Sequence, residues 1–215
     1  MKLPSHHQIA SFDVDAQRGF SPLCPNELPV PGGDRIVDEL NHQALLAGFR
    51  VGSKDAHSPQ AVWVTEDPAR IGKPGVPGRN VEEHWPVHAV PGTPGFELLP
   101  GLPAPVEYDF FVWKGVELDL HPYGACFHDL DERLSTGVIE WLGAREISHV
   151  LIGGLATDYC VRSTVLQLRR ADFAVVLNLA ASRGIAIETT ATAIDEMRAA
   201  GTHIVDCAAD LEPRQ

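Results

Sequence analysis

Residues 150–177 read VLIGGLATDYCVRSTVLQLRRADFAVVL and contain a complete strand–helix–strand unit. Residues 150–153 form a short apolar run typical of a buried strand, and a glycine-rich turn follows it. The apolar spacing predicts a helix over residues 158–170, and residues 173–177 form a second apolar strand. Two strands joined by a helix are typical of a parallel pair, so this stretch indicates an α/β fold.

The rest of the chain repeats this alternation of strand and helix. Further strands are predicted at residues 9–14, 49–52, 108–113 and 203–205, and further helices at residues 33–46, 131–142 and 187–200. The order predicts a three-layer α/β/α sandwich with a mainly parallel, Rossmann-like sheet of about six strands. We expect residues 1–215 to form a single domain, interrupted by a long Pro/Gly-rich loop at about residues 58–106. This loop carries Trp85 and His88, which suggests an ordered functional segment.

The composition excludes several classes of function. The chain has 17 Lys and Arg against 29 Asp and Glu, a formal net charge of −12. An acidic chain lacks the basic surface that binds nucleic acid or an anionic membrane, so we expect a small-molecule partner. No stretch has the ~18 apolar residues of a membrane-spanning helix, and the polar N-terminus predicts a cytoplasmic protein. The four cysteines form no CxxC pair and no disulfide framework. We also expect a homo-oligomer.

Reactive side chains follow the first four predicted strands. In chain order these residues are Asp13, Asp15, Asp55, His57, Lys114 and Cys160. Ligands of open parallel sheets bind beyond the carboxyl ends of the strands, so we expect these side chains to converge on one edge of the sheet.

The convergence predicts nucleophilic catalysis. Cys160 lies in the first turn of its predicted helix, where the helix dipole and free amides stabilise a thiolate and can bind an oxyanion. The alternative is a buried structural cysteine. Lys114 would lower the pKa of a neighbouring thiol, or it is a solvated strand end. Either Asp13 or Asp15 could accept the thiol proton, and their shared strand end does not distinguish them.

Asp55 and His57 form a candidate metal pair. They are two residues apart, so on an extended chain their side chains point the same way. His88 would supply a third ligand from the long loop, and His84 competes with it. One carboxylate and two imidazoles suit zinc, iron or manganese better than calcium. Because the chain has ten histidines, a chance pairing is the alternative.

Five segments, which together span almost the whole chain, resemble the nicotinamidases of the isochorismatase-like cysteine hydrolase superfamily. They are DAQRGF at 15–20, GGD at 32–34, SKDAH at 53–57, WPVHAVPGTPG at 85–95 and GLATDYCV at 154–161. The last two are long and specific, and they favour nicotinamidases over other members. The resemblance implies hydrolysis of nicotinamide to nicotinate and ammonia through a cysteine thioester.

The resemblance also implies a role for individual residues. It selects Asp15 over Asp13, because the family's acid stands two residues before a glutamine, here Gln17, and it gives the triad Asp15, Lys114 and Cys160. The implied metal ligands are Asp55, His57 and His88, holding one divalent ion, zinc in the first place, with iron or manganese as alternatives. The implied ring-stacking aromatics are Phe20 and Trp85, and the implied oxyanion hole is formed by the amides of Ala156 and Cys160, beside a cis peptide at 155–156.

Some positions depart from the family pattern. The family often has a further histidine a few residues after His57, but residues 58–62 contain none, so water is expected in place of a fourth protein ligand. Ala56 stands where the family often has tryptophan, and Ala89 replaces a cysteine. The alternatives are a hydrolase of another small amide, a catalytically idle binding protein, and a structural zinc protein, which would require four protein ligands.

Overall fold

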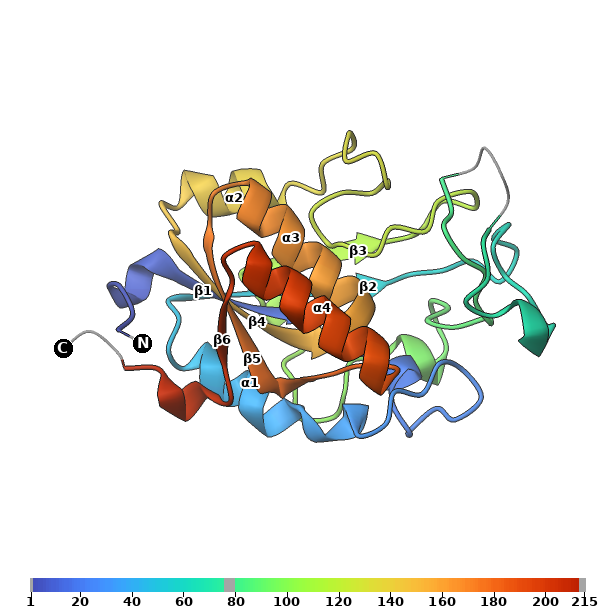
Figure 1. Ribbon diagram of the computed structural model, residues 1–215, viewed down its shortest axis with the longest axis horizontal. Coiled ribbons are helices and arrows are strands. Elements are labelled where there is room, and N and C mark those ends of the chain that lie inside the picture. The colour runs from blue at the N-terminus through green and yellow to red at the C-terminus, as the bar shows by residue number, and fades with distance from the viewer. Residues whose placement is uncertain (1, 76–79, 213–215) are drawn as a thin grey trace.

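A six-stranded parallel sheet forms the centre of the computed structural model, which describes residues 2–75 and 80–212 (Figure 1). The strands are β1 (Ile9–Val14), β2 (Phe49–Asp55), β3 (Phe110–Lys114), β4 (His149–Leu155), β5 (Ala174–Arg183) and β6 (His203–Val205). Their order is β3-β2-β1-β4-β5-β6, and every neighbouring pair is parallel. The predicted parallel α/β sheet is therefore confirmed.

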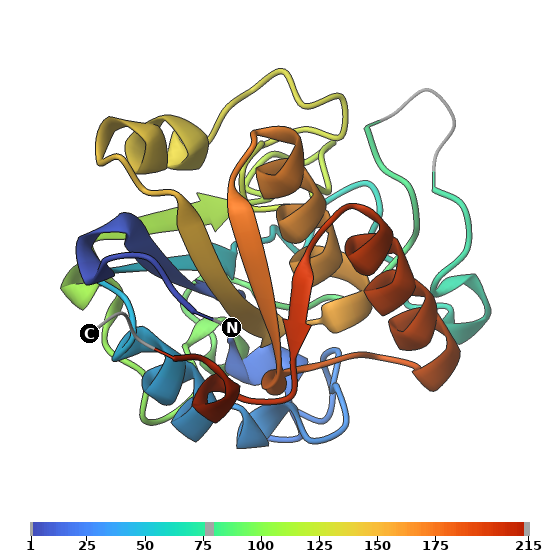
Figure 2. The same cartoon turned by 60° about the vertical axis from the view of Figure 1, so that its left-hand side comes forward.

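Helices cover both faces of the sheet, as the three-layer prediction requires (Figure 2). One face carries α1 (Val37–Ala44), and the other carries α2 (Val138–Ala144), α3 (Arg162–Arg170) and α4 (Ile187–Ala199). All six residues of β1 are buried, as are the last six of β4. Covering on both faces explains why these central strands are nearly continuous apolar runs in the sequence. No helix within residues 2–75 and 80–212 is long and apolar enough to cross a membrane.

Two predicted helices are shorter than the apolar spacing suggested. The helix expected at 131–142 begins only at Val138, because the Asp129 carboxylate accepts the amides of Arg133 and Leu134 in a turn. Gly137, with φ of +86°, then reorients the chain before α2. The helix expected at 33–46 is divided into a 3₁₀ turn and α1.

The order of the strands reverses between β1 and β4, so the carboxyl ends of the central strands flank a crevice. β4 runs so close to β1 that a Cβ on Gly154 would lie 1.9 Å from the Val14 carbonyl oxygen. The helix predicted from residue 158 begins as a π-turn at Thr157–Val161 before α3. Such turns occur often at functional sites, and this one presents Cys160 above the sheet.

Candidate active site

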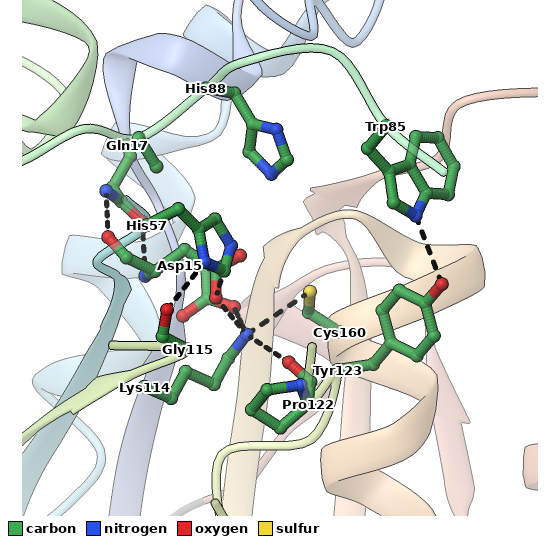
Figure 3. Close-up of polar contacts among 12 residues, drawn as sticks. Asp15, Gln17, His57, Trp85, His88, Lys114, Gly115, Pro122, Tyr123 and Cys160 are labelled. Carbon is green, nitrogen blue, oxygen red and sulfur yellow. Dashed lines mark hydrogen bonds and ion pairs between the residues drawn. The ribbon is translucent and has the colours of Figure 1, made fainter. Parts of the chain in front are cut away.

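Lys114, at the end of β3, is the centre of a buried polar cluster (Figure 3). Its Nζ lies 3.0 Å from Asp15 Oδ2 and 3.7 Å from Cys160 Sγ, and it also contacts the Asp55 carboxylate. Nζ donates a further hydrogen bond to the Pro122 carbonyl over 3.1 Å. Lys114 and Asp15 are fully buried, and Cys160 is 6% exposed. The structure therefore brings together an acid, a cation and a thiol from three different strand ends.

The two acids at the carboxyl end of β1, Asp13 within it and Asp15 just after it, have different surroundings. Asp13 accepts hydrogen bonds from the Tyr108 hydroxyl, over 2.9 Å, and from the Arg50 guanidinium. Asp15 instead accepts a hydrogen bond from Ser53 Oγ over 2.7 Å, and its other oxygen faces Lys114. Asp15 also has a φ of +44°, a conformation that is uncommon for residues other than glycine. Of these two acids, only Asp15 therefore faces Lys114 and Cys160, while Asp13 holds β1 against β2 and Tyr108.

Burial and charge act on the thiol in opposite directions. Burial raises the pKa of Cys160 well above its usual range, while the Lys114 cation lowers it, in the direction that the sequence predicted. Burial also raises the pKa of Asp15, an effect that Lys114 only partly offsets, so this carboxylate is a stronger base than usual. A carboxylate oxygen of Asp15 lies within 4.8 Å of Cys160 Sγ.

The candidate metal ligands converge beside this cluster. Asp55 Oδ1 lies 3.4 Å from His57 Nε2, and the rings of His57 and His88 have centroids 4.8 Å apart. His57 Nδ1 donates to the Gly115 carbonyl over 3.0 Å, and His88 Nδ1 donates to the Pro86 carbonyl over 2.7 Å. Burial lowers the pKa of His88 to about 3, so its imidazole is neutral, the form that binds metals.

Asp55 and its strand are held rigidly. Burial opposes its ionisation, yet Lys114 holds the pKa of Asp55 far below its usual range. Gln17 binds both backbone groups of Asp55, accepting its amide over 2.7 Å and donating to its carbonyl over 3.0 Å. The ends of β1 and β2 are therefore tied together, and the Asp55 carboxylate is kept charged between Lys114 and His57.

His84, the competing ligand, is engaged elsewhere. Its Nδ1 donates to the Trp63 carbonyl over 3.0 Å, and its Nε2 lies 2.7 Å from Arg70 Nη2. Both ring nitrogens are used, so His84 has none to offer an ion.

A narrow cavity lies between the thiol and the histidines. Its lining residues are Phe20, Leu28, Asp55, Trp85, His88, His121, Tyr123, Ala156, Tyr159, Cys160 and Ile185. Both predicted aromatics are among them. Phe20 is tilted against the His88 ring at 5.3 Å, and Trp85 Nε1 donates to the Tyr123 hydroxyl over 3.1 Å. The peptide at Leu155–Ala156 is cis, as the resemblance implied.

Some residues of this cavity were not predicted from the sequence, above all Tyr123, Tyr159 and His121. Tyr159 packs edge-on against Trp85, and Tyr123 packs on Tyr159, so the three rings form one wall. His121 and Tyr123 lie in a loop between β3 and α2 that has no regular period. The only signal in the sequence was the dense run HPY at 121–123.

Comparisons with known proteins identify the family of the chain. The isochorismatase domain family matches residues 14–209. The nicotinamidase/pyrazinamidase of Mycobacterium tuberculosis is 34% identical over 197 residues, covering 89% of this chain and 95% of that protein. A nicotinamidase/pyrazinamidase structure from Acinetobacter baumannii has a TM-score of 0.82 at 25% identity, covering 95% of this chain and 98% of that one.

A structure of the pyrazinamidase of Pyrococcus horikoshii in complex with zinc is also similar. Its TM-score is 0.72 at 30% identity, and the match covers 92% of this chain and 98% of that one. Sequence and fold thus agree over nearly the full length of these relatives. The chain belongs to the isochorismatase family, within which it is similar to nicotinamidases and pyrazinamidases.

Proposed function

We propose that this protein is an amidohydrolase that converts nicotinamide to nicotinate and ammonia through a thioester on Cys160. The observation that carries the proposal is the buried contact of Lys114 with both Asp15 and Cys160, the last of which lines an aromatic cavity. The substrate class is proposed from the similar proteins, which are named nicotinamidases and pyrazinamidases. We propose that residues 1–215 act as one hydrolase domain; a cytoplasmic location and a homo-oligomer stay predictions.

We propose that one divalent ion, zinc in the first place, is bound by Asp55, His57 and His88. The donors fit, because they combine a charged carboxylate with two imidazoles, and His57 Nε2 is buried without a hydrogen-bond partner. A related pyrazinamidase was solved with zinc. When bound, the ion would hold the pyridine nitrogen and orient the ring between Phe20 and Trp85.

The first half-reaction forms the thioester. Asp15 takes the proton of the Cys160 thiol while Sγ attacks the amide carbon, so the carbon–sulfur bond forms and the carbonyl oxygen becomes negative. The amides of Ala156 and Cys160 stabilise this oxyanion. Asp15 then gives its proton to the departing nitrogen, and the carbon–nitrogen bond breaks to release ammonia.

The second half-reaction restores the enzyme. Asp15, again a carboxylate, accepts a proton from water, whose oxygen attacks the thioester carbon. The carbon–sulfur bond breaks, Cys160 regains the proton, and nicotinate leaves. Burial opposes the charge of Lys114, but the neighbouring carboxylates of Asp15 and Asp55 raise its pKa well above its usual range, so it stays protonated. Its fixed charge stabilises each anion of the cycle.

We expect the purified, zinc-supplemented protein to release one ammonia per nicotinate formed from nicotinamide, and to do so faster than from benzamide, which lacks the ring nitrogen.

Chelation of the ion should raise KM for nicotinamide more than it changes the unfolding temperature, because the ion binds at the cavity and not in the core. Ammonia release and thermal unfolding measure the two effects. No release with zinc, iron or manganese added, or an unchanged KM in metal-free enzyme, would contradict the proposal.

A further inference from the structure

Three histidines from three separate segments share one buried pocket. His57 follows β2, His88 comes from the β2–β3 loop and His121 from the β3–α2 loop. Each offers a ring nitrogen, and these nitrogens lie within 4.8 Å of one another. All three side chains are at most 3% exposed. The three histidines are far apart in the sequence, and only the folded loops bring them together.

His121 is the member of this cluster that lacks every ordinary partner. Both of its ring nitrogens are buried, and neither makes a hydrogen bond. Buried polar atoms in native proteins are nearly always partnered, so an imidazole with two orphaned nitrogens indicates a site for a ligand. His57 and His88 instead each use Nδ1 on a backbone carbonyl. That bond leaves Nε2 as the acceptor nitrogen, the arrangement typical of metal-bound histidines.

The three histidines do not gather around a free carboxylate as an ion pair would. Asp55 is the carboxylate nearest to it, and Asp55 is already engaged by the Lys114 ammonium as well as by His57. His121 instead packs against the other two histidines. Its ring is 5.0 Å from that of His57 and 6.1 Å from that of His88, between centroids.

Trp63 fixes the three rings from one side. Its ring centroid lies 4.7 Å from that of His57, 5.4 Å from His88 and 4.3 Å from His121, and the residue is fully buried. Gly115 also packs closely against His57, since a Cβ added to Gly115 would lie 2.3 Å from the ring. The imidazoles are therefore held in place by packing before any ion binds, as a metal site of high affinity requires.

We propose that His121 is a ligand of the metal ion, so that the protein supplies three imidazoles and the Asp55 carboxylate. This inference rests on the metal of the proposed function. It replaces the water expected where residues 58–62 lack a histidine: the fourth protein donor comes from a later loop. A donor set this rich in imidazole favours zinc or iron over manganese and magnesium.

The test compares metal binding in the full-length protein and its His121→Ala variant, without substrate. Zinc affinity is measured by competition with a chromophoric chelator, and X-ray absorption fine structure counts imidazole ligands on bound zinc. Loss of a residue that merely orients a ligand costs roughly 10–100-fold in affinity, so we expect a loss of about 100-fold or more. The imidazole count should fall from three to two. His128→Ala, on the same loop, is the control and should bind zinc normally.

The outcomes separate this inference from the proposed function. Wild-type affinity in His121→Ala, or only two imidazoles on zinc in the wild type, would overturn it. If the variant does not fold, the wild-type imidazole count alone decides. Three imidazoles in a protein that releases no ammonia from nicotinamide would support the ligand and refute the activity. A wild type that binds no zinc would overturn both this inference and the metal of the proposed function.

Discussion

Cys160→Ala is expected to lower kcat for nicotinamide by about 10⁴-fold or more while the fold remains intact. Removal of a catalytic nucleophile has effects of this order, because the remaining groups then act only on water. The truncation removes one buried sulfur atom, so the free energy of unfolding should change by about 1 kcal/mol or less. Coupled measurement of ammonia release, together with urea unfolding, gives both quantities.

Cys126→Ala is the matched control for this variant. Cys126 is also a free, fully buried thiol, but it lies in the hydrophobic core and does not line the cavity. Its loss should leave kcat within about threefold of the wild type. Equal activity of Cys160→Ala and the wild type would refute the covalent mechanism.

Lys114→Met should have the largest effect on stability. It leaves the carboxylates of Asp15 and Asp55 buried without their cation, and breaking a buried ion pair in this way costs roughly 3–5 kcal/mol. We expect kcat to fall by about 10²–10⁴-fold as well, since the acid–base function of Asp15 loses its electrostatic partner. Urea unfolding at neutral pH measures the first effect and ammonia release the second.

The loss of stability in Lys114→Met should depend on pH with a defined sign. Without the cation, burial and mutual repulsion raise the folded-state pKa of Asp15 above its unfolded value. The folded variant then binds more protons than the unfolded chain, so its free energy of unfolding falls as pH rises. The deficit relative to wild type should be largest at neutral pH and shrink toward pH 5. A deficit that grows on acidification would contradict the assigned charges.

Lys54 provides the control for a buried lysine. Its side chain is nearly buried over the Phe96 ring, and its ion-pair partner Glu97 is 4.0 Å away and mostly exposed. Because no buried carboxylate loses its partner, Lys54→Met should change the free energy of unfolding by about 1 kcal/mol or less. It should also show no stability gain on acidification. The contrast isolates the role of the two carboxylates around Lys114.

The sheet was predictable because strands buried on both faces are recognisable in the sequence as short apolar runs. β1 has its predicted bounds, and the four strand ends carry the reactive side chains where the argument from topology expected them. The start of α2 was not predictable from apolar spacing, because side-chain-to-backbone bonds from Asp129 form a turn instead. β5 runs to Arg183, six residues beyond its prediction, because its pairing with β4 resumes after a bulge.

The site residues that lie at strand ends were predictable from the sequence, whereas those that lie in irregular loops were not. Asp15 and Cys160 follow strands and Lys114 ends one, so their convergence follows from the parallel sheet. His121 lies far from His57 in the sequence and follows no strand directly, so only the folded loops bring it to the cluster. The burial that raises the pKa of Cys160 likewise depends on the packed fold and has no local signal in the sequence.

Turnover should pass through a thioester on Cys160, and hydroxylamine can intercept that intermediate. Hydroxylamine attacks a thioester but not the amide itself under mild conditions, so it diverts the acyl group to nicotinohydroxamate. We predict that hydroxamate forms in proportion to added hydroxylamine, with undiminished ammonia release, and that Cys160→Ala forms none. Full release of ammonia and nicotinate with no hydroxamate at any hydroxylamine concentration would mean direct attack by water and would contradict the account.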